Sequence, residues 1–259
     1  MGKVEANSLI AYGRGKKLKA MYCPGEMVGV LYGEVTEKLG LGPALHKAGT
    51  TMGLSSYGTP FDFDYQSYTD DIKHKMDVAA SVQNLFENKV LSVLNDVDQN
   101  SDNLCLSGGS FLNCNANSEV VRKSKFKHFH HFPACGDDGT SVGSALYVSH
   151  HIFGEARYDY DVPDICYTGR DYQGQTPDYD YIAKQLADGK IIGFFQGRSE
   201  FGPRALGNRS ILADPRNFHN RELINHVVKN REWFRPFAPV TLEECYQDWF
   251  DFPIPSPYM

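Results

Sequence analysis

Apolar and polar positions follow two different spacings along this 259-residue chain. Residues 76–97 place valine, leucine and phenylalanine on one face at three- and four-residue intervals, which predicts an amphipathic helix. The same spacing over residues 27–39 predicts a helix that ends at Gly40. Further helices are predicted over residues 113–121, 141–148, 178–188 and 218–229.

Short apolar runs and alternating segments predict strands between these helices. Residues 103–106 and 191–195 are short and continuously apolar, as buried strands are, and residues 127–132 alternate as a strand does. Residues 1–25 predict a hairpin that turns at Gly13-Arg14-Gly15. Strands interspersed with helices predict an α/β protein.

Three stretches follow neither spacing. Residues 48–60 contain three glycines and are interpreted as a plain turn region. Residues 57–71 are polar and aromatic, which predicts an excursion over the surface. Residues 153–177 are rich in tyrosine, aspartate, proline and glycine, and they are the best candidate for a linker between two domains.

Residues 191–216 concentrate positive charge and glycine directly after a predicted strand. A guanidinium group matches a phosphate or carboxylate with two parallel hydrogen bonds, and glycine lets backbone N–H groups approach the same oxygens. This combination predicts an oxyanion site built on the arginines of the stretch, Arg198, Arg204, Arg209 and Arg216. The alternative is that these arginines pair with nearby acids, namely Glu200, Asp214 and Glu222.

Two other glycine loops could bind a ligand. Ser107-Gly108-Gly109-Ser110 joins a predicted strand to a predicted helix, and the exposed N–H groups and helix dipole of such a turn suit a phosphate. The alternative is a simple strand-to-helix turn. The loop Gly136-Asp137-Asp138-Gly139 offers two adjacent carboxylates, which could hold a metal or a ribose or could cap the following helix.

Histidines and cysteines give no clear metal or disulfide pattern. His128 and His130 share one face of their predicted strand and His131 lies on the other, so at most two ligands come from this segment. Solvated or hydrogen-bonded histidines are therefore the preferred interpretation. The six cysteines include no C-x-x-C pair, which favours reduced packing residues over disulfides or a structural zinc site.

Charge and hydropathy narrow the class of partner. The formal net charge of −6 argues against a general nucleic-acid-binding protein, whose surface would be basic overall. No apolar run approaches the roughly 20 residues that span a bilayer, and the first residues, MGKVEANS, lack the apolar core of a signal peptide. We expect a cytoplasmic protein with small-molecule ligands and neither a nucleic-acid nor a membrane partner.

Four segments together resemble one enzyme family. They are MGLSSYG (52–58), LSGGSFLNCNAN (106–117), GDDGTSVGSAL (136–146), and GRSEFGPRALGNRSILADPR (197–216) followed by REWFRPFAPV (231–240). In content and order they are similar to the carbamoyltransferase family, which includes the nodulation-factor and antibiotic-tailoring O-carbamoyltransferases. The resemblance covers essentially the whole chain.

The resemblance implies two partial domains. Residues 1–165 would be the second lobe of an actin-like/Hsp70-like (ASKHA) domain, and residues 166–259 the start of a threonylcarbamoyl-AMP-synthase-like α/β domain. In the family, the second domain makes carbamoyl-adenylate from carbamoyl phosphate and ATP with Mg²⁺. The first domain transfers the carbamoyl group to a hydroxyl of a sugar or natural product, with Fe or Zn near the nucleotide. The acceptor itself is not specified by these motifs.

The resemblance also implies roles for individual residues. In the first domain the adenylate would be held by Ser107, Gly108, Gly109 and Asn113. Asp137 matches the single carboxylate among the family's metal ligands. In the second domain carbamoyl phosphate and ATP would be held by the catalytic residues Arg204, Arg209 and Lys229 and the binding residues Arg198, Ser210 and Arg231.

One departure from the family pattern concerns the metal. The family's remaining metal ligands include an H-x-x-x-H pair, and this chain contains none. The chain is therefore interpreted as an internal part, or a reduced relative, of a longer protein, with the missing lobe or a homodimer partner completing it. The alternatives are a non-catalytic module that binds phosphate or nucleotide, and an ATPase of the actin-like superfamily.

Overall fold

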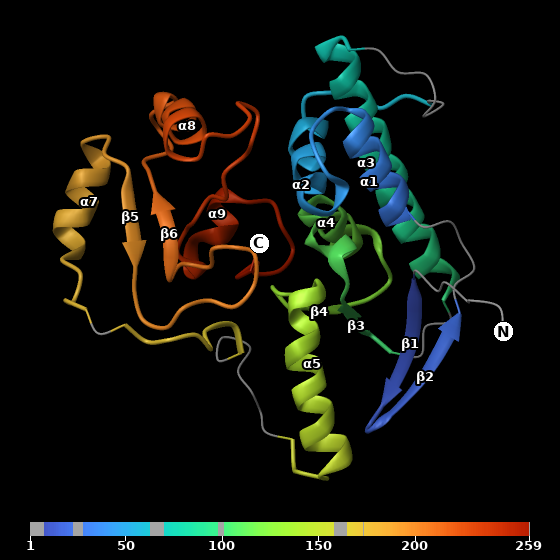
Figure 1. Ribbon diagram of the computed structural model, residues 1–259. Coiled ribbons are helices and arrows are strands. Elements are labelled where there is room, and N and C mark those ends of the chain that lie inside the picture. The colour runs from blue at the N-terminus through green and yellow to red at the C-terminus, as the bar shows by residue number, and fades with distance from the viewer. Residues whose placement is uncertain are drawn as a thin grey trace. The chain divides into compact units, whose positions relative to one another are not determined.

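The computed structural model describes residues 8–22, 28–62, 70–97, 101–157, 165–172 and 174–258, and Figure 1 shows their elements. They form a mixed α/β protein whose described strands pair two by two. Two compact units result. The first comprises Met1–Leu104, Asn113–Phe129 and Val142–Arg157, and the second comprises Cys105–Leu112, His130–Ser141 and Tyr158–Met259. The division at residues 165 and 166 stays a prediction.

The first unit begins with the predicted hairpin. Strands β1 (Leu9–Arg14) and β2 (Lys17–Tyr22) are antiparallel and pair Arg14 with Lys17. The turn therefore lies at Gly15 and Lys16, later than the predicted position, because Gly15 takes the left-handed backbone (φ 60°) that the turn requires. Lys16 Nζ donates a hydrogen bond to the His150 carbonyl at 3.0 Å, which attaches the hairpin to the end of this unit.

Four helices form the core of the first unit. They are α1 (Val28–Lys38), α2 (Ala44–Ser55), α3 (Ile72–Asp96) and α4 (Cys114–Lys123), which lie together in Figure 1. The predicted apolar faces of α1 and α3 are buried, and the core includes Val35, Leu39, Leu54, Val82, Phe86 and Val120. Leu85 was predicted on the buried face of α3 but is 45% exposed. Gly40, with φ of 71°, follows α1 as predicted.

Helix α2 corrects the prediction of a turn region over residues 48–60, since residues 48–55 are helical and the turn is confined to residues 56–60. Its small residues favour close helix packing, since Thr50 and Thr51 are fully buried and Thr51 Oγ1 lies 2.8 Å from Thr36 Oγ1 of α1. A Cβ on Gly33 of α1 would lie 2.8 Å from the Ala44 side chain. Small side chains therefore bring α1 and α2 together, where the sequence alone suggested a turn region.

The remaining elements of the middle of the chain follow the predictions closely. Strands β3 (Asn103–Leu106) and β4 (His128–His131) pair with each other and contribute residues to both units. Helix α5 (Thr140–Tyr147) continues into the π-helix η3 (Val148–Ile152). The predicted excursion over residues 57–71 lies partly outside the described residues, as does Cys23; the five described cysteines are free thiols.

The second unit contains helix α7 (Tyr179–Ala187) and the antiparallel strands β5 (Ile192–Phe195) and β6 (Arg209–Leu212). These are followed by α8 (His219–Leu223), the π-helix η4 (Ile224–Val228), the 3-10 turn η5 (Glu243–Cys245) and α9 (Tyr246–Trp249). Strand β5 was predicted to be fully buried, but its positions alternate between half-buried and exposed. A two-stranded sheet covered on one face explains this pattern.

Part of the predicted linker packs into the second unit. Cys166 is fully buried, and its carbonyl accepts a hydrogen bond from Phe201 N at 2.7 Å. Gly169 N donates to Ser199 O at 2.9 Å, and Ser199 N donates to Arg170 O at 3.0 Å. Residues 165–172 are therefore a backbone partner of the arginine-rich stretch, not a linker. Residues 158–164 and 173 lie outside the described part of the chain.

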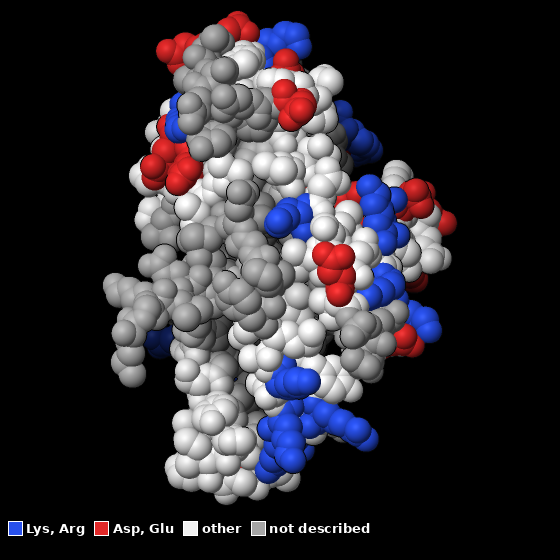
Figure 2. Space-filling view, turned by 90° about the vertical axis from the view of Figure 1, so that its right-hand side faces the viewer, with Lys and Arg blue, Asp and Glu red and all other residues white. Residues whose placement is uncertain are grey.

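Charge on the surface is mixed. Figure 2 shows acidic and basic side chains together over much of one face, with Lys and Arg gathered towards its lower end. Among the helices that the structure describes, none has the length and hydropathy needed to cross a membrane.

Candidate functional site

The arginine-rich stretch forms the loop between β5 and β6 in the second unit. Gln196 N donates to Asn208 O at 3.0 Å and so closes the base of the loop. Inside it, Gly197, Gly202 and Gly207 have φ of 58°, 110° and 107°, a region that favours glycine. The glycines are therefore required by the loop's shape, and the loop presents a fixed backbone, as the sequence predicted.

A buried carboxylate, that of Glu200, organises this loop. Glu200 Oε1 accepts hydrogen bonds from the backbone N–H groups of Leu206 (2.8 Å), Asn208 (2.6 Å) and Arg209 (3.3 Å). The Glu200 side chain is 0% exposed. Burying a charge is costly unless it is paired and hydrogen-bonded, and here the donors come from the loop itself. The anion that these backbone groups bind in the structure is the chain's own carboxylate.

Arg209 is the charged partner of that carboxylate. Arg209 Nε donates to Glu200 Oε2 at 2.9 Å, and Nη2 donates to the carbonyls of Gly202 and, at 3.4 Å, of Arg204. Of the two interpretations of the arginines, pairing with nearby acids therefore holds for Arg209. It also holds for Arg216, whose guanidinium binds Asp214. Hydrogen bonds from the Arg216 side chain and backbone, with a smaller contribution from its charge, lower the pKa of the Asp214 carboxyl to about 2.

Arg204 links the loop to another predicted motif within the same unit. Arg204 Nη2 donates to the Leu112 carbonyl at 3.0 Å, just after the turn Ser107-Gly108-Gly109. A Cβ on Gly202 would lie 3.2 Å from Ala134, so the loop also closely approaches the segment before Asp137. Residues 105–112, 130–141 and 197–209 thus converge in the second unit, although the sequence assigned them to two domains.

The glycine turn after β3 is exposed, and a backbone hydrogen bond to the buried Cys135 fixes it in place. Gly108 has φ of 110°, and its N–H donates to the Cys135 carbonyl at 2.7 Å. Burial raises the pKa of the Cys135 thiol to about 11, so this cysteine stays neutral at physiological pH. Ser107, Gly108 and Gly109 remain exposed and accessible to a ligand. The 3-10 turn η1 (Gly109–Leu112) separates them from the helix that follows.

Asn113 has a structural role in the first unit. Its Oδ1 accepts from Ala116 N at 3.1 Å, which caps α4. The same amide exchanges hydrogen bonds with Gln83, at 2.9 Å and 3.1 Å. Tyr32 Oη donates to Gln83 Oε1 at 2.8 Å, and burial raises the pKa of Tyr32. The Asn113 side chain is thus engaged in a cap and a partly buried network, and its predicted contact with an adenylate stays a prediction.

Asp137 lies in the 3-10 turn η2 (Asp137–Gly139) and is exposed. Its carbonyl accepts from Thr140 Oγ1 at 2.6 Å, and the Asp138 carbonyl accepts from Ser141 Oγ at 2.9 Å. Over the described residues no three histidine, cysteine or acidic side chains come together as metal ligands. One exposed carboxylate does not make a transition-metal site, so the residues described here do not fit the family's Fe or Zn.

The other predicted binding residues differ in exposure and in whether their side chains already contact the protein. Arg198 and Lys229 are exposed, and neither side chain has a partner among the described residues. Ser210 is half-buried on β6, opposite Phe194. Arg231 is engaged: its Nε donates to Asn225 Oδ1 at 2.7 Å, its guanidinium lies 4.8 Å from the Phe237 ring centre, and burial lowers its pKa.

Sequence reasoning missed two polar residues that hold the site. Asn225 is fully buried and donates to the carbonyls of Trp233 and Arg235, both at 3.1 Å. Tyr167 Oη donates to the Leu206 carbonyl at 2.9 Å, and burial, with the nearby charge of Glu200, raises the pKa of Tyr167. Tyr167 lies in the supposed linker, so no local signal pointed to it. Asn225 sits in a helical pattern whose burial the sequence does not show.

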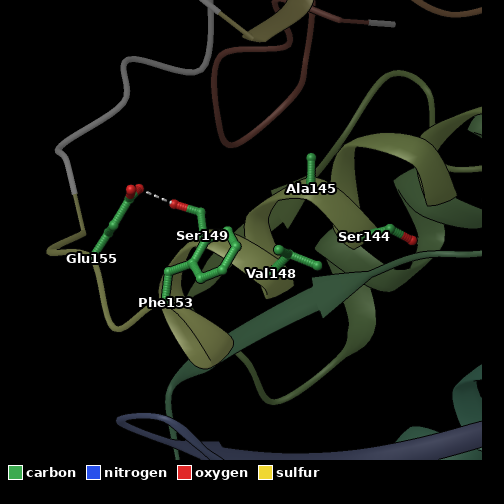
Figure 3. A pocket seen from close by; sticks show the side chains of 6 residues that line it. All are labelled: Ser144, Ala145, Val148, Ser149, Phe153 and Glu155. Atoms are coloured by element: carbon green, nitrogen blue, oxygen red, sulfur yellow. Dashed lines mark hydrogen bonds between the residues drawn. The ribbon is translucent and has the colours of Figure 1, made fainter.

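A shallow pocket in the first unit has a different character. It measures about 520 Å³ and is lined by Ser144, Ala145, Val148, Ser149, Phe153 and Glu155, shown in Figure 3. Ser149 Oγ donates to the Glu155 carboxylate. This lining carries no basic side chain, so it does not suit an anionic ligand.

Comparison with known proteins identifies the two-part organisation. The family model described as Carbamoyltransferase N-terminus matches residues 63–146, and that described as Carbamoyltransferase C-terminus matches residues 183–259. The second match begins within α7 and contains the whole β5–β6 loop. The chain belongs to the carbamoyltransferase family, which confirms the resemblance seen in the sequence.

Similar proteins include two named ones. Nodulation protein NolNO of Sinorhizobium fredii is 34% identical over 96% of this chain and 44% of its own length. A 3'-hydroxymethylcephem-O-carbamoyltransferase of Amycolatopsis lactamdurans is 28% identical over 94% of this chain and 54% of its own length. An uncharacterised protein of Synechocystis is 41% identical over 72% of this chain and 34% of its own. The chain therefore spans about a third to a half of these relatives.

The relatives also differ from the chain within the matched region. The alignment with NolNO extends over 302 positions, more than the 259 residues of this chain. That relative therefore carries residues, inside the region of similarity, that this chain lacks. Mixed α/β structure is confirmed by the fold, while the assignment of an actin-like lobe stays a prediction.

Proposed function

We propose that this chain is part of an ATP-dependent O-carbamoyltransferase. Its C-terminal region would bind carbamoyl phosphate and ATP with Mg²⁺ and form carbamoyl-adenylate. The carbamoyl group would then pass to a hydroxyl of a sugar or natural product, with release of AMP; the name of one relative, a 3'-hydroxymethylcephem-O-carbamoyltransferase, specifies a hydroxyl acceptor of the second kind. Membership of the family and the mixed α/β fold support the proposal.

The observation that carries the proposal is the rigid loop between β5 and β6. Glu200 and three left-handed glycines fix its backbone, and Arg198 extends from it without a partner among the described residues. Arg209 keeps part of its guanidinium accessible, because its side chain is 41% exposed. Fixed positive groups stabilise charge on transferring phosphoryl groups, which is what adenylate formation requires.

The chemistry assigned to this loop balances as follows. Water hydrolyses carbamoyl phosphate to carbamate and inorganic phosphate, and a carbamate oxygen then attacks the α-phosphorus of ATP and displaces pyrophosphate. Arg204, Arg209 and Lys229 would neutralise the phosphate charges, while Arg198, Ser210 and Arg231 would orient the ligands. No step is assigned to a transition metal, because no three potential metal ligands come together among the described residues.

Product analysis of the full chain tests this function. Carbamoyl phosphate, ATP and Mg²⁺ are incubated with the protein, and phosphate and pyrophosphate are measured separately. We expect both products in equal amounts, with phosphate release dependent on ATP beyond the spontaneous rate. Arg14→Ala, which removes an exposed arginine on the hairpin of the first unit, is the matched control. Phosphate release that ignores ATP would argue against adenylate formation.

A second candidate function is a binding module without turnover. This function is favoured by the surroundings of Asp137, which is exposed and belongs to no group of three metal ligands among the described residues. The carbamoyl transfer site of the family needs a metal that such a carboxylate cannot hold. Such a module would bind phosphate or nucleotide at the same loop and release no pyrophosphate. Saturable binding of ATP or carbamoyl phosphate with no products would support it. The missing lobe, or a homodimer partner, is the proposed source of the remaining metal ligands.

A further inference from the structure

Among the described charged groups, Glu200 is unusual because it lies buried beneath a loop that is expected to bind anions. The residue is 6% exposed, and its side chain is fully buried. Four hydrogen bonds from the loop reach its two oxygens. A carboxylate in this place reduces the positive charge that an oxyanion ligand would meet. Glu200 must therefore contribute to the site in another way.

We propose that Glu200 is a positioning residue that sets the direction of the Arg209 guanidinium for an oxyanion ligand. The proposal rests on the proposed function for the identity of the ligand, carbamoyl phosphate or ATP. It goes beyond that function by assigning a role to a residue that would not touch the ligand.

The division of work between the two carboxylate oxygens supports this role. Oε1 binds three backbone N–H groups and thereby fixes the loop around residues 206–209. Oε2 is left for Arg209 Nε, at 2.9 Å. Carboxylate and guanidinium prefer planar, charge-assisted contacts, so an immobilised carboxylate also fixes the plane of the guanidinium.

Carbonyls of the same loop complete the support of Arg209. Nη2 donates to Gly202 and Arg204 carbonyls, so two of the three guanidinium nitrogens are held by the protein. Nη1 has no partner among the described residues, and the side chain is 41% exposed. A guanidinium held on two edges presents its remaining N–H groups in a fixed direction, which lowers the entropy lost when a ligand binds.

Glu200→Gln separates the two tasks of the carboxylate. The amide oxygen of glutamine can still accept from the backbone N–H groups, but its NH₂ would face the Nε–H of Arg209, donor against donor. We expect the loop to persist and Arg209 to lose its fixed direction. The dissociation constant for carbamoyl phosphate should then rise by about 10- to 150-fold, the effect of losing one hydrogen bond to a charged group.

A double-mutant cycle shows whether Glu200 acts through Arg209. The set is Glu200→Gln, Arg209→Lys and the double variant, with inorganic phosphate and carbamoyl phosphate as probes in calorimetric titrations. If Glu200 positions Arg209, the double variant binds no more weakly than Arg209→Lys alone. Additive losses would mean that Glu200 supports the site independently of Arg209 and would overturn the proposal, as would unchanged binding by Glu200→Gln.

A spectroscopic measurement on the unaltered protein covers the case in which a variant does not fold. The Nε–H of Arg209, assigned through its side-chain and backbone connectivities in the isotope-labelled unaltered protein, should exchange with water at least tenfold more slowly than that of the exposed Arg198. Equal exchange rates would overturn the proposal. Both readouts are independent of turnover, so absence of pyrophosphate formation would reject the proposed function while leaving the role of Glu200 to be decided by coupling and exchange.

Discussion

Removing the Arg209 side chain should destabilise the second unit, because it leaves a buried carboxylate without its charged partner. Arg209→Ala deletes the 2.9 Å bond to Glu200 and two bonds to loop carbonyls. Breaking a buried ion pair costs about 3–5 kcal/mol. The Arg209 side chain is 41% exposed and three backbone donors remain on Glu200, so water and these donors offset part of the loss. We expect about 2–3 kcal/mol.

Tryptophan fluorescence during urea unfolding measures this loss directly. The two tryptophans of the chain, Trp233 and Trp249, both belong to the second unit, so their signal reports the unit that contains Arg209. Arg198→Ala is the matched control, since its side chain has no partner among the described residues, and it should cost less than about 0.5 kcal/mol. If Arg209→Ala unfolds at the same urea concentration as Arg198→Ala, the ion pair does not stabilise the loop.

Three further predictions concern ligand binding, capping and pH. Arg198→Ala should weaken carbamoyl phosphate binding about 10- to 150-fold in calorimetry and Arg198→Lys less so, whereas equal affinities would remove Arg198 from the site. Asn113→Ala should lower the free energy of unfolding by about 1–2 kcal/mol, measured by thermal unfolding, and Asn113→Asp should lower it less because it keeps the helix cap. Equal losses would contradict a capping role. Burial lowers the pKa of His131 below 6.5, so the stability that its neutral form contributes above pH 6.5 should be lost as pH falls through the folded pKa. His131→Gln should reduce this dependence of the unfolding free energy on pH, and an unchanged dependence would refute the prediction.

The spacing of apolar residues predicted those helices and strands that bury one face and expose the other. Helix α3, the hairpin, β3 and the succession of α7 and β5 all occur near the predicted positions, because amphipathic spacing and turn residues act locally. Helix α2 was missed because its buried threonines pack against α1, where Thr51 contacts Thr36 and Gly33 lets Ala44 approach, and this packing is not visible in the residue spacing of α2 itself. Strand β5 was predicted to be buried, but its positions alternate between half-buried and exposed, because its two-stranded sheet is covered on one face.

The sequence predicted the arginine loop and its acidic partners, but not the hydrogen bonds that hold the loop's backbone. The sequence located the arginine loop and named Glu200 and Asp214 as alternative partners, and the structure pairs both with arginines. It did not predict that Glu200 would also bind three backbone N–H groups, because that requires the loop to fold back over its own acid. The same holds for residues 165–172, whose backbone bonds to the loop leave no mark in composition.

The density of arginines in this family motif follows from two separate demands. A loop with left-handed glycines exposes carbonyls that no strand pairing satisfies, and the Arg209 guanidinium donates to two of them, those of Gly202 and Arg204. The Arg204 guanidinium donates to the Leu112 carbonyl at the end of η1. These arginines therefore bind backbone carbonyls of the protein itself in the absence of any ligand. Among the predicted binding residues that the structure describes, the unengaged cations are Arg198 and Lys229. A substitution that weakens binding at Arg204 or Arg209 must consequently be separated from its effect on the loop, whereas the same substitution at Arg198 reports on the ligand directly.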